Sequence, residues 1–437
     1  MSEWEILQGS VFARLAELDD GIAQCCITSP PYFGLRDYGT AEWEGGDPAC
    51  SHRVGGAVED QKAPRRHRIT GVRPMKDSST CGLCGAIRID EQIGLERTPD
   101  LYAEKMVAVF QQVRRVLRDD GVVWLNLGDS YNAYNGNSGP GSGIDGPGRA
   151  RNTQRPALAT GHGLRVGSLK PKDLLGIPWL VAFALREDGW YLRKDIIWHK
   201  PNPMPESVID RPTSAHEHVF LLAKSDRYYY DAEAISEEAT YGEPNSPQSI
   251  KSPYGQGFTE RAERGESAPA SRRRNKRDVW TVATRPYPDA HFATFPEELI
   301  VPMVLAGSAP QACSSCGAPW TRVVERKDEG WNGSRYGKRK VESNGGVQTG
   351  GTERSTLGSS NGTGTAQAET TGWKPTCSHA DGGGRSLVID PFAGSGTTLG
   401  VAVAHGRDAL GVELNPEYVE LVRRRMSGVT APLFAGL

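Results

Sequence analysis

The sequence predicts an α/β fold with a βαβ unit, and two stretches near opposite ends of the chain carry this prediction. Residues 387–390 are typical of a short buried strand, and a glycine turn, an apolar helix over 397–404 and a second strand over 409–414 follow. Residues 22–27 are typical of another buried strand. Open α/β sheets bind ligands at the carboxyl ends of their strands, so the residues that follow these strands are candidate site residues.

The composition limits the class of protein. A chain of 437 residues forms one large α/β domain with insertions, or two to three domains. It has no run of 18 apolar residues and no basic-then-apolar start, so neither a membrane span nor export is indicated and a cytoplasmic location is expected. The net charge of −2 decides nothing about a polyanionic partner, because local clustering matters more. Stretches rich in Gly and Pro predict loops at about 133–168, 240–270 and 330–385.

The glycine turn near the C-terminus indicates a nucleoside cofactor site. Gly394 and Gly396 follow the strand that ends at Asp390, and they let a cofactor lie against the backbone. Glu413 ends the second strand, 23 positions after Asp390, where a carboxylate can accept both hydroxyls of a ribose. A nicotinamide-binding fold is the alternative, but its fingerprint needs a third glycine where this chain has Leu399. The spacing therefore disfavours a dinucleotide.

The segment after the strand over 22–27 reads Thr28-Ser29-Pro30-Pro31-Tyr32 and suits a flat ring that bears an amine. Two consecutive prolines stiffen the chain and leave carbonyls free to accept hydrogen bonds. The Ser29 hydroxyl and the Pro30 carbonyl could accept the N–H groups of an exocyclic nucleobase amine, which would favour the pyramidal nitrogen that attacks a methyl group. Tyr32 offers a face on which a flipped base can stack. The alternative is a Pro-Pro turn with a packing tyrosine.

Longer stretches around both segments resemble one enzyme family. Residues 390–398 (Asp-Pro-Phe-Ala-Gly-Ser-Gly-Thr-Thr) and 411–418 resemble the S-adenosylmethionine motif of DNA amino-methyltransferases. Residues 28–39 resemble the catalytic segment of the N4-cytosine and N6-adenine DNA methyltransferase family, and its order before the cofactor motif resembles the β-type circular permutation. The resemblance covers a little over half of the chain and continues through segments 121–129, 192–202, 215–218, 279–280 and 291–296.

This resemblance implies a Rossmann-like, S-adenosylmethionine-dependent methyltransferase fold with a seven-stranded, mostly parallel sheet. It implies direct methyl transfer to an amine of a base flipped out of duplex DNA, with Ser29, Pro30, Pro31 and Tyr32 as catalytic residues. A cognate restriction endonuclease is a candidate partner, and the sequence predicts no oligomeric state. The cofactor-binding residues that it implies are Thr28, Phe295, Asp390, Phe392, Gly394, Gly396, Thr397, Thr398, Glu413 and Asn415.

The target base is inferred from Ser29. In the family, serine at this position goes more often with N4-cytosine, whereas Asp or Asn goes more often with N6-adenine, so N4-cytosine is favoured and N6-adenine is the alternative. C5-cytosine chemistry needs a cysteine nucleophile, typically in a Pro-Cys pair, and this sequence has none. A catalytically inactive, zinc-dependent DNA-binding protein is an alternative of another class, but neither motif is degraded.

Two basic blocks are candidates for DNA contact. One block lies within the interval 231–290, where a β-type enzyme is expected to recognise its target. The other lies over 62–76 and has six basic residues and no acidic one. A solvated surface loop is the alternative for each. The block in the recognition interval consists of Arg272, Arg273, Arg274, Lys276 and Arg277.

Six of the eight cysteines, with two histidines, form two sets that predict structural zinc sites. Each set offers three sulfurs and one imidazole, which leaves no open coordination position, and each Cys-x-x-Cys is followed by Gly-Ala, a turn that can bring N–H groups toward sulfur. Unligated thiols, a redox Cys-x-x-Cys and pairing across the inserts are alternatives. Cys25 and Cys26 are predicted core residues. The two sets are Cys50, His52, Cys81 and Cys84, and Cys313, Cys316, Cys377 and His379.

The predicted organisation combines these segments. The methyltransferase core has its catalytic segment at 1–39, further core at 99–230 and 291–311, and its cofactor-binding part at 385–437. A first zinc-binding insert spans 40–98, the target-recognition region spans 231–290, and a second zinc-binding insert with a Gly/Ser-rich loop spans 312–384.

Overall fold

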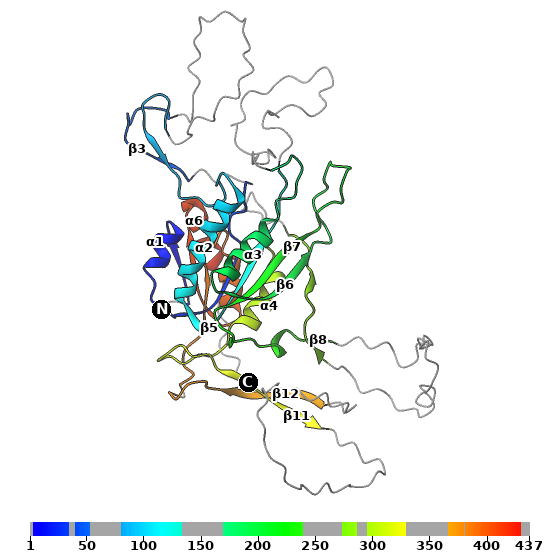
Figure 1. The fold of residues 1–437 in the computed structure, drawn as a ribbon. Helices are drawn as coiled ribbons and strands as arrows, with labels where there is room; N and C mark the ends of the chain where they lie inside the picture. The colour runs from blue at the N-terminus through cyan, green and yellow to red at the C-terminus, as the bar shows by residue number, and fades with distance from the viewer. Residues whose placement is uncertain are drawn as a thin grey trace, which may run out of the picture. The chain divides into compact units, whose positions relative to one another are not determined.

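The structure of the protein is a computed structural model (Figure 1). The residues that it describes are 3–34, 40–52, 80–132, 169–238, 273–285, 295–328, 366–379 and 381–429. These residues belong to two compact units. The larger comprises Met1–Ala234, Arg277–Trp320 and Pro375–Gly436, and the smaller comprises Ile235–Lys276 and Thr321–Lys374. The predicted loops over 133–168 and 240–270 and the basic block over 62–76 lie outside the described residues.

An eight-stranded sheet forms the centre of the larger unit, in the order β1-β14-β13-β2-β5-β7-β6-β10. Neighbouring strands are parallel except at β7, which is antiparallel to both β5 and β6. The mostly parallel α/β sheet predicted from the sequence is confirmed, with a short extra strand, β10, beside β6. The strands are β1 Trp4–Gln8, β2 Ala23–Thr28, β5 Leu117–Leu127, β6 Tyr191–His199, β7 His216–Ala223, β10 Val279–Thr281, β13 Leu387–Asp390 and β14 Asp408–Glu413.

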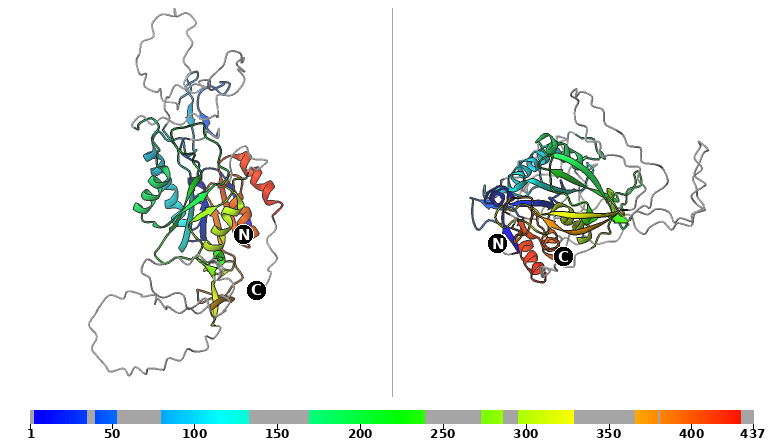
Figure 2. Two further views of the ribbon diagram at one scale, coloured as in Figure 1. Left: turned by 90° about the vertical axis from the view of Figure 1, so that its right-hand side faces the viewer. Right: turned by 90° about the horizontal axis from the view of Figure 1, so that it is seen from below.

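Helices cover both faces of this sheet (Figures 1 and 2). The first three pack together on one face, and the last three pack on the other. The helices are α1 Val11–Ala16, α2 Pro99–Val116, α3 Ile177–Glu187, α4 Glu297–Gly307, α5 Thr397–Ala404 and α6 Pro416–Met426. Among the described helices, none combines the length and the apolar character that a membrane span requires.

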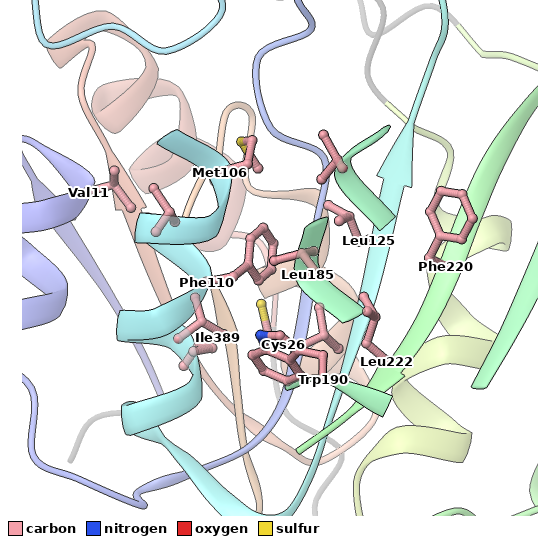
Figure 3. Close-up of a cluster of buried hydrophobic side chains, with 14 of the residues drawn as sticks. Val11, Cys26, Met106, Phe110, Leu125, Leu185, Trp190, Phe220, Leu222 and Ile389 are labelled. Carbon is pink, nitrogen blue, oxygen red and sulfur yellow. The ribbon is translucent and has the colours of Figure 1, made fainter. Parts of the chain in front are cut away.

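The core lies between the sheet and α2 and α3 (Figure 3), where Met106 and Phe110 of α2 pack over Cys26, Leu125 and Ile389. All six residues of β2 are buried, as expected for a central strand covered by helices on both faces. Cys25 and Cys26 are fully buried, which confirms their prediction as core residues. Burial raises the pKa of both thiols, so they remain protonated.

Helix α2 ties the core to the segment that follows β2. Thr98 caps its first turn by accepting a hydrogen bond from the Leu101 N–H at 3.3 Å, and Pro99 occupies the first helical position, where its missing N–H costs nothing. Tyr102 is buried one turn later, and its hydroxyl donates to the carbonyl of Pro31 at 3.0 Å. The exit of β2 is therefore held by a buried helix.

Among the described residues, three antiparallel strand pairs lie outside the main sheet. In the larger unit, β3 (Glu42–Glu44) pairs with β4 (Ile87–Ile89). A 3₁₀ turn, η1 (Glu233–Ile235), precedes β8 (Glu237–Glu238) in the sequence. In the smaller unit, β8 pairs with β9 (Arg273–Arg274). There, too, β11 (Thr321–Asp328) pairs with β12 (Ala366–Lys374).

One prediction about the chain's organisation needs correction. The predicted loop over 330–385 includes β12, because its backbone pairs along the whole length of β11, a distant partner that local composition does not reveal. The interval 231–290 also includes β10, which pairs in parallel with β6 in the core sheet, and target recognition by this interval stays a prediction.

Candidate active site

A pocket of about 350 Å³ lies at the carboxyl edge of the sheet and brings together the two segments that the sequence singles out. The exits of β2, β13 and β14 meet there, because these strands are parallel neighbours. Thr28, Asp390, Gly396 and Thr398 do not line it. The predicted residues that do are Ser29, Pro30, Pro31, Tyr32, Phe295, Phe392, Gly394, Thr397, Glu413 and Asn415.

Thr28 and Asp390 join the two halves beneath the pocket. The Thr28 hydroxyl donates to Asp390 Oδ1 at 2.6 Å, and the backbone N–H of Phe392 donates to the same oxygen at 3.1 Å. Burial raises the pKa of Asp390 to about 6 despite these bonds. Thr398 fixes the same region through its hydroxyl, which donates to the Ile27 carbonyl at 3.3 Å. These residues hold the glycine turn against β2, although the sequence had placed them at the cofactor.

The glycine turn needs backbone conformations that other residues rarely adopt. Gly394 has φ +52° and Gly396 has φ +76°, both in the left-handed region. A Cβ atom on Gly396 would also lie 3.0 Å from Cγ1 of Val422 on α6. The turn therefore exposes the Gly394 backbone to the pocket, while Gly396 packs tightly against α6.

Glu413 sits at the tip of β14 with each carboxylate oxygen held by a backbone amide. Gly394 N–H donates to Oε2 and Asn415 N–H donates to Oε1, both at 2.8 Å. Burial raises the pKa of Glu413 to about 7. Each carboxylate oxygen keeps a second lone pair, so the group can still accept hydroxyl donors from a ligand. Asn415 also caps α6, since its side chain accepts the N–H of Glu417 at 2.8 Å.

A hydrogen-bonded network surrounds the predicted catalytic segment, which also lines the pocket. Tyr32 Oη donates to Glu217 Oε2 at 2.6 Å, and Asn126 Nδ2 donates to the same carboxylate oxygen at 2.9 Å and to Tyr32 Oη at 2.8 Å. The Ser29 hydroxyl donates to Tyr32 Oη at 3.2 Å. Lys200 forms an ion pair with the other oxygen of Glu217.

Sequence reasoning missed the roles of Asn126, Lys200 and Glu217 in this network. They come from the end of β5, from the residue after β6 and from the start of β7, which all reach the same edge of the sheet. One signal was available, because Asn126 is a polar residue within the otherwise apolar end of a buried strand, where only 4% of it is exposed.

Comparison with known proteins identifies the family of this site. A family model described as DNA methylase, for N6 and N4 methyltransferases, matches residues 23–313 and 378–424. The chain belongs to this N6/N4 DNA methylase family. The match includes the catalytic and the cofactor segments, so the resemblance drawn from their motifs is confirmed. It omits 314–377, which lies within the second predicted insert.

Two similar proteins cover nearly the whole methylase. The type II methyltransferase M.Cfr9I of Citrobacter freundii is 33% identical over 429 residues, which are 97% of this chain and 87% of that protein. M.SmaI of Serratia marcescens is 32% identical over 422 residues, covering 97% and 90%. Among solved structures, the cytosine-N4-specific PvuII DNA methyltransferase aligns with a TM-score of 0.45 and 12% identity, over 97% of this chain and 88% of that one.

The methylase brings each predicted set of metal ligands together within its own insert. In both sets the four ligand atoms lie within 4.8 Å of one another. In the first, His52 Nδ1 lies 3.2 Å from Cys84 Sγ, and the His52 ring stacks on Trp43 with centroids 5.0 Å apart. The structure therefore groups the ligands as the sequence predicted, and pairing across the inserts is not seen among the described residues.

Both clusters are built on the same turn. In the first, the N–H of Cys81 donates to the Ala86 carbonyl at 2.7 Å and Gly85 donates back to Cys81 at 3.0 Å. The second repeats this pattern from Cys313 through Gly317 to Ala318, at 2.9 and 2.8 Å. Gly85 and Gly317 have φ values of +75° and +66°, which explains the glycine in each Cys-x-x-Cys-Gly-Ala motif.

The basic block of the methylase is described only in part. Arg272 and the block over 62–76 lie outside the described residues. Arg273 and Arg274 form β9 in the smaller unit, where Arg274 pairs with Glu237 at 3.0 Å. Lys276 and Arg277 follow β9 and precede the core strand β10. Their contact with DNA stays a prediction.

Proposed function

We propose that this methylase transfers a methyl group from S-adenosylmethionine to the exocyclic N4 amine of cytosine at a specific site in duplex DNA. The observation that carries the proposal is a single pocket lined both by residues 29–32 and by the glycine turn with Glu413. Its volume of about 350 Å³ falls in the range of small-molecule sites. When bound, the cofactor supplies the activated methyl group on its sulfonium.

The residues present fit such a cofactor. Glu413 would accept the ribose hydroxyls, and Gly394 leaves the backbone open to close approach. Phe295 and Phe392 line the same pocket and offer apolar faces to an adenine ring. Thr397 and Asn415 complete the polar lining.

On the substrate side, Ser29 and Pro30 would accept the two N–H groups of the amine. In the part of the chain that the structure describes, no donor reaches the Pro30 carbonyl, whereas the Pro31 carbonyl already accepts the Tyr102 hydroxyl. The rigid Pro-Pro exit holds both acceptors in place. Tyr32 would stack against the flipped base, and transfer would go directly to nitrogen.

The choice of N4-cytosine rests on Ser29 and on the family pattern, and N6-adenine is the second candidate because the matched family includes both. An inactive DNA-binding protein is the alternative of another class, and the intact network around Tyr32 speaks against it. A partner endonuclease is proposed from the similarity to type II methyltransferases.

The product nucleoside tests the proposal directly. Purified methylase is incubated with labelled S-adenosylmethionine and mixed-sequence DNA, the DNA is digested to nucleosides, and the labelled one is identified by chromatography. Label in N4-methylcytosine supports the proposal, whereas label in N6-methyladenine overturns the choice of base. Failure to bind the cofactor would favour the inactive protein.

Cofactor affinity should depend on pH through Glu413. Its pKa of about 7 lies above the ordinary value near 4.3, so it gains a proton as the pH falls through 7 and then loses acceptor strength. We expect S-adenosylmethionine to bind about tenfold more weakly at pH 6 than at pH 8, measured by calorimetry. Glu413→Gln should bind weakly at both values, and an unchanged pH dependence in that variant would contradict the assignment.

The contribution of Glu413 to protein stability should change with pH in the direction opposite to that of cofactor affinity. Because the folded pKa of Glu413 is raised, the folded state binds the proton more tightly than the unfolded state does. Its contribution to the free energy of unfolding is therefore present below about pH 4 and is lost as the pH rises to about 7. Binding and stability measurements across the same range would thus separate the two effects.

The position of the Tyr32 ring also depends on the absence of a side chain at Gly128. A Cβ atom there would lie 2.7 Å from Cε2 of Tyr32. We expect Gly128→Ala to displace the ring and to lower kcat about tenfold or more, with cofactor binding unchanged, because misplacement of about 1 Å is costly. Gly400→Ala is the matched control, since its new Cβ would meet no atom closer than 3.6 Å. Wild-type kcat in Gly128→Ala would show that the ring position is not critical.

We also infer that each cysteine cluster holds a structural zinc ion. Tetrahedral coordination with Zn–S bonds of about 2.3 Å places ligand atoms about 3.7 Å apart, and the 4.8 Å limit fits small adjustments on binding. Three thiols and one imidazole per cluster leave no position for a substrate. The inserts would then be stabilised by zinc without taking part in methyl transfer.

A further inference from the structure

Glu217 occupies an unusual position for a charged residue. It lies near the start of β7, next to the ends of β5 and β6, and only 16% of its side chain is exposed. Both carboxylate oxygens are engaged, one by Lys200 and the other by Tyr32 and Asn126. A largely buried carboxylate needs such partners to remain charged. The ammonium group of Lys200 therefore compensates the charge of the Glu217 carboxylate at the edge of the pocket.

The direction of the hydrogen bonds is fixed by chemistry. An ionised carboxylate can only accept, so Asn126 must present its amide nitrogen to Glu217. The same nitrogen donates to Tyr32 Oη, so the hydroxyl proton of Tyr32 points to Glu217. The Ser29 hydroxyl in turn donates to Tyr32 Oη. The result is an ordered chain of donors from Ser29 through Tyr32 to Glu217.

Burial and the neighbouring Glu217 raise the pKa of Tyr32, so the tyrosine keeps its proton between turnovers. A neutral tyrosine can pass a proton onward only when it receives another, and its Oη already lies 3.2 Å from the Ser29 oxygen that supplies one. Ser29 is also the residue proposed to accept an N–H of the amine. The chain therefore begins at the nitrogen that gains the methyl group.

We propose that Glu217 is the final acceptor of the proton that the amine releases on methylation, reached through Tyr32 and Ser29. The proposal rests on the proposed role of Ser29 in binding the amine. As the new N–C bond forms, the S–C bond breaks and its electron pair goes to sulfur. The nitrogen then carries a positive charge, which it loses by releasing one proton.

The proton balance along the chain is complete without another reactant. The amine gives its proton to Ser29 Oγ, Ser29 gives its own to Tyr32 Oη, and Tyr32 gives its own to Glu217. Nitrogen becomes neutral, and Glu217 becomes a neutral carboxylic acid beside Lys200. The acid returns its proton to solvent after the product leaves, which restores the ion pair.

Glu217→Gln is the sharpest test, because glutamine keeps an oxygen that can accept from Tyr32 but is far too weak a base to take the proton. We expect kcat to fall about 100-fold or more, with KM for DNA and the affinity for S-adenosylmethionine unchanged. Glu17→Gln is the matched control, because Glu17 is half-exposed on the surface, where it pairs with Arg14. It should leave all three parameters unchanged.

Tyr32→Phe breaks the same chain at a second point while it keeps the aromatic face. Because both substitutions interrupt one path, the double variant Tyr32→Phe/Glu217→Gln should lose little more than either single variant. Losses that multiply in the double variant would contradict a single chain.

Other outcomes separate this proposal from the proposed function. If Ser29→Ala lowers turnover while Glu217→Gln keeps wild-type kcat, the proton path is wrong and the methylation site stands. If Ser29→Ala itself keeps wild-type turnover, the proposed amine site is wrong. A Glu217→Gln variant that loses cofactor binding together with kcat would show that Glu217 only shapes the pocket, and the proton path would again be overturned.

Discussion

Replacing Ser29 or Tyr32 by alanine is expected to lower kcat about 100- to 1,000-fold while S-adenosylmethionine still binds with nearly wild-type affinity. Ser29→Ala removes an acceptor for the amine, and Tyr32→Ala removes both the stacking face and the centre of the hydrogen-bonded network. The proposed cofactor contacts come from the other side of the pocket, from the glycine turn and from Glu413. The two halves of the site should therefore respond separately.

Thr28→Val offers a matched contrast one position away. Valine has nearly the shape of threonine but cannot donate to Asp390, whose carboxylate also holds the start of the glycine turn through Phe392. We expect this variant to weaken cofactor binding more than it slows methyl transfer at saturating cofactor. Calorimetric titration and single-turnover rates of both variants would make the comparison. Loss of cofactor binding in Ser29→Ala would contradict the division of roles.

The parts of this site that the sequence predicts are those encoded by neighbouring residues. The glycine turn is such a part, because left-handed backbone at Gly394 and Gly396 requires glycine and leaves a recognisable spacing. Each Cys-x-x-Cys-Gly-Ala motif is another, since the backbone hydrogen bonds that form its turn join residues within the motif. Local chemistry of this kind can be interpreted before any fold is known.

Other parts depend on strand order, which no local pattern contains. Asn126 and Glu217 meet only because β7 runs antiparallel beside β5, and Lys200 joins them only because β6 ends at the same edge. Edge strands are equally hard to predict. The pattern of β1 is only partly buried, and its place in the sheet is decided by pairing with β14, more than 400 residues later in the sequence.

The basic block illustrates a further limit. Its charges predict contact with DNA, but Arg274 is held by Glu237, a carboxylate that lies far from it in the sequence. Composition cannot distinguish a paired arginine from a free one, because the partner is chosen by the fold.

Loss of the proposed zinc ions is expected to have different effects at the two clusters, since the first continues into residues that line the pocket and the second contacts the amino end of β5. The first cluster is followed by β4 and then by residues 91–93, which line the pocket. Gly94 continues this stretch, and its carbonyl accepts the N–H of Gly34, two residues after Tyr32, at 2.8 Å. The second cluster instead accepts a hydrogen bond through Cys316, from Arg118 at the start of β5, away from the pocket.

We therefore expect Cys84→Ser to bind one zinc ion per chain instead of two and to lose most of its methyl transfer. Structural zinc contributes about 10–16 kcal/mol of binding free energy to such small sites, so the first insert should lose its order without it. Residues 91–94 would then no longer support Tyr32. Gly94 packs tightly against the backbone of Tyr32, since a Cβ atom on Gly94 would lie 2.9 Å from the Tyr32 carbonyl oxygen, and this packing depends on an ordered insert. Zinc content by mass spectrometry and single-turnover rates would measure both effects.

Cys316→Ser should also bind one zinc ion but should behave differently in activity. Its cluster supports the amino end of β5, so we expect a lower melting temperature with a nearly wild-type turnover per folded molecule. Ser51→Ala and Ser315→Ala, which change exposed residues between the ligands, are the controls and should keep two zinc ions. Two bound zinc ions in Cys84→Ser would show that this thiol is not a ligand. The expected difference in activity rests on the first cluster, which continues into the residues that contact the predicted catalytic segment. Equal activity losses in Cys84→Ser and Cys316→Ser would therefore show that proximity to the pocket does not decide the effect.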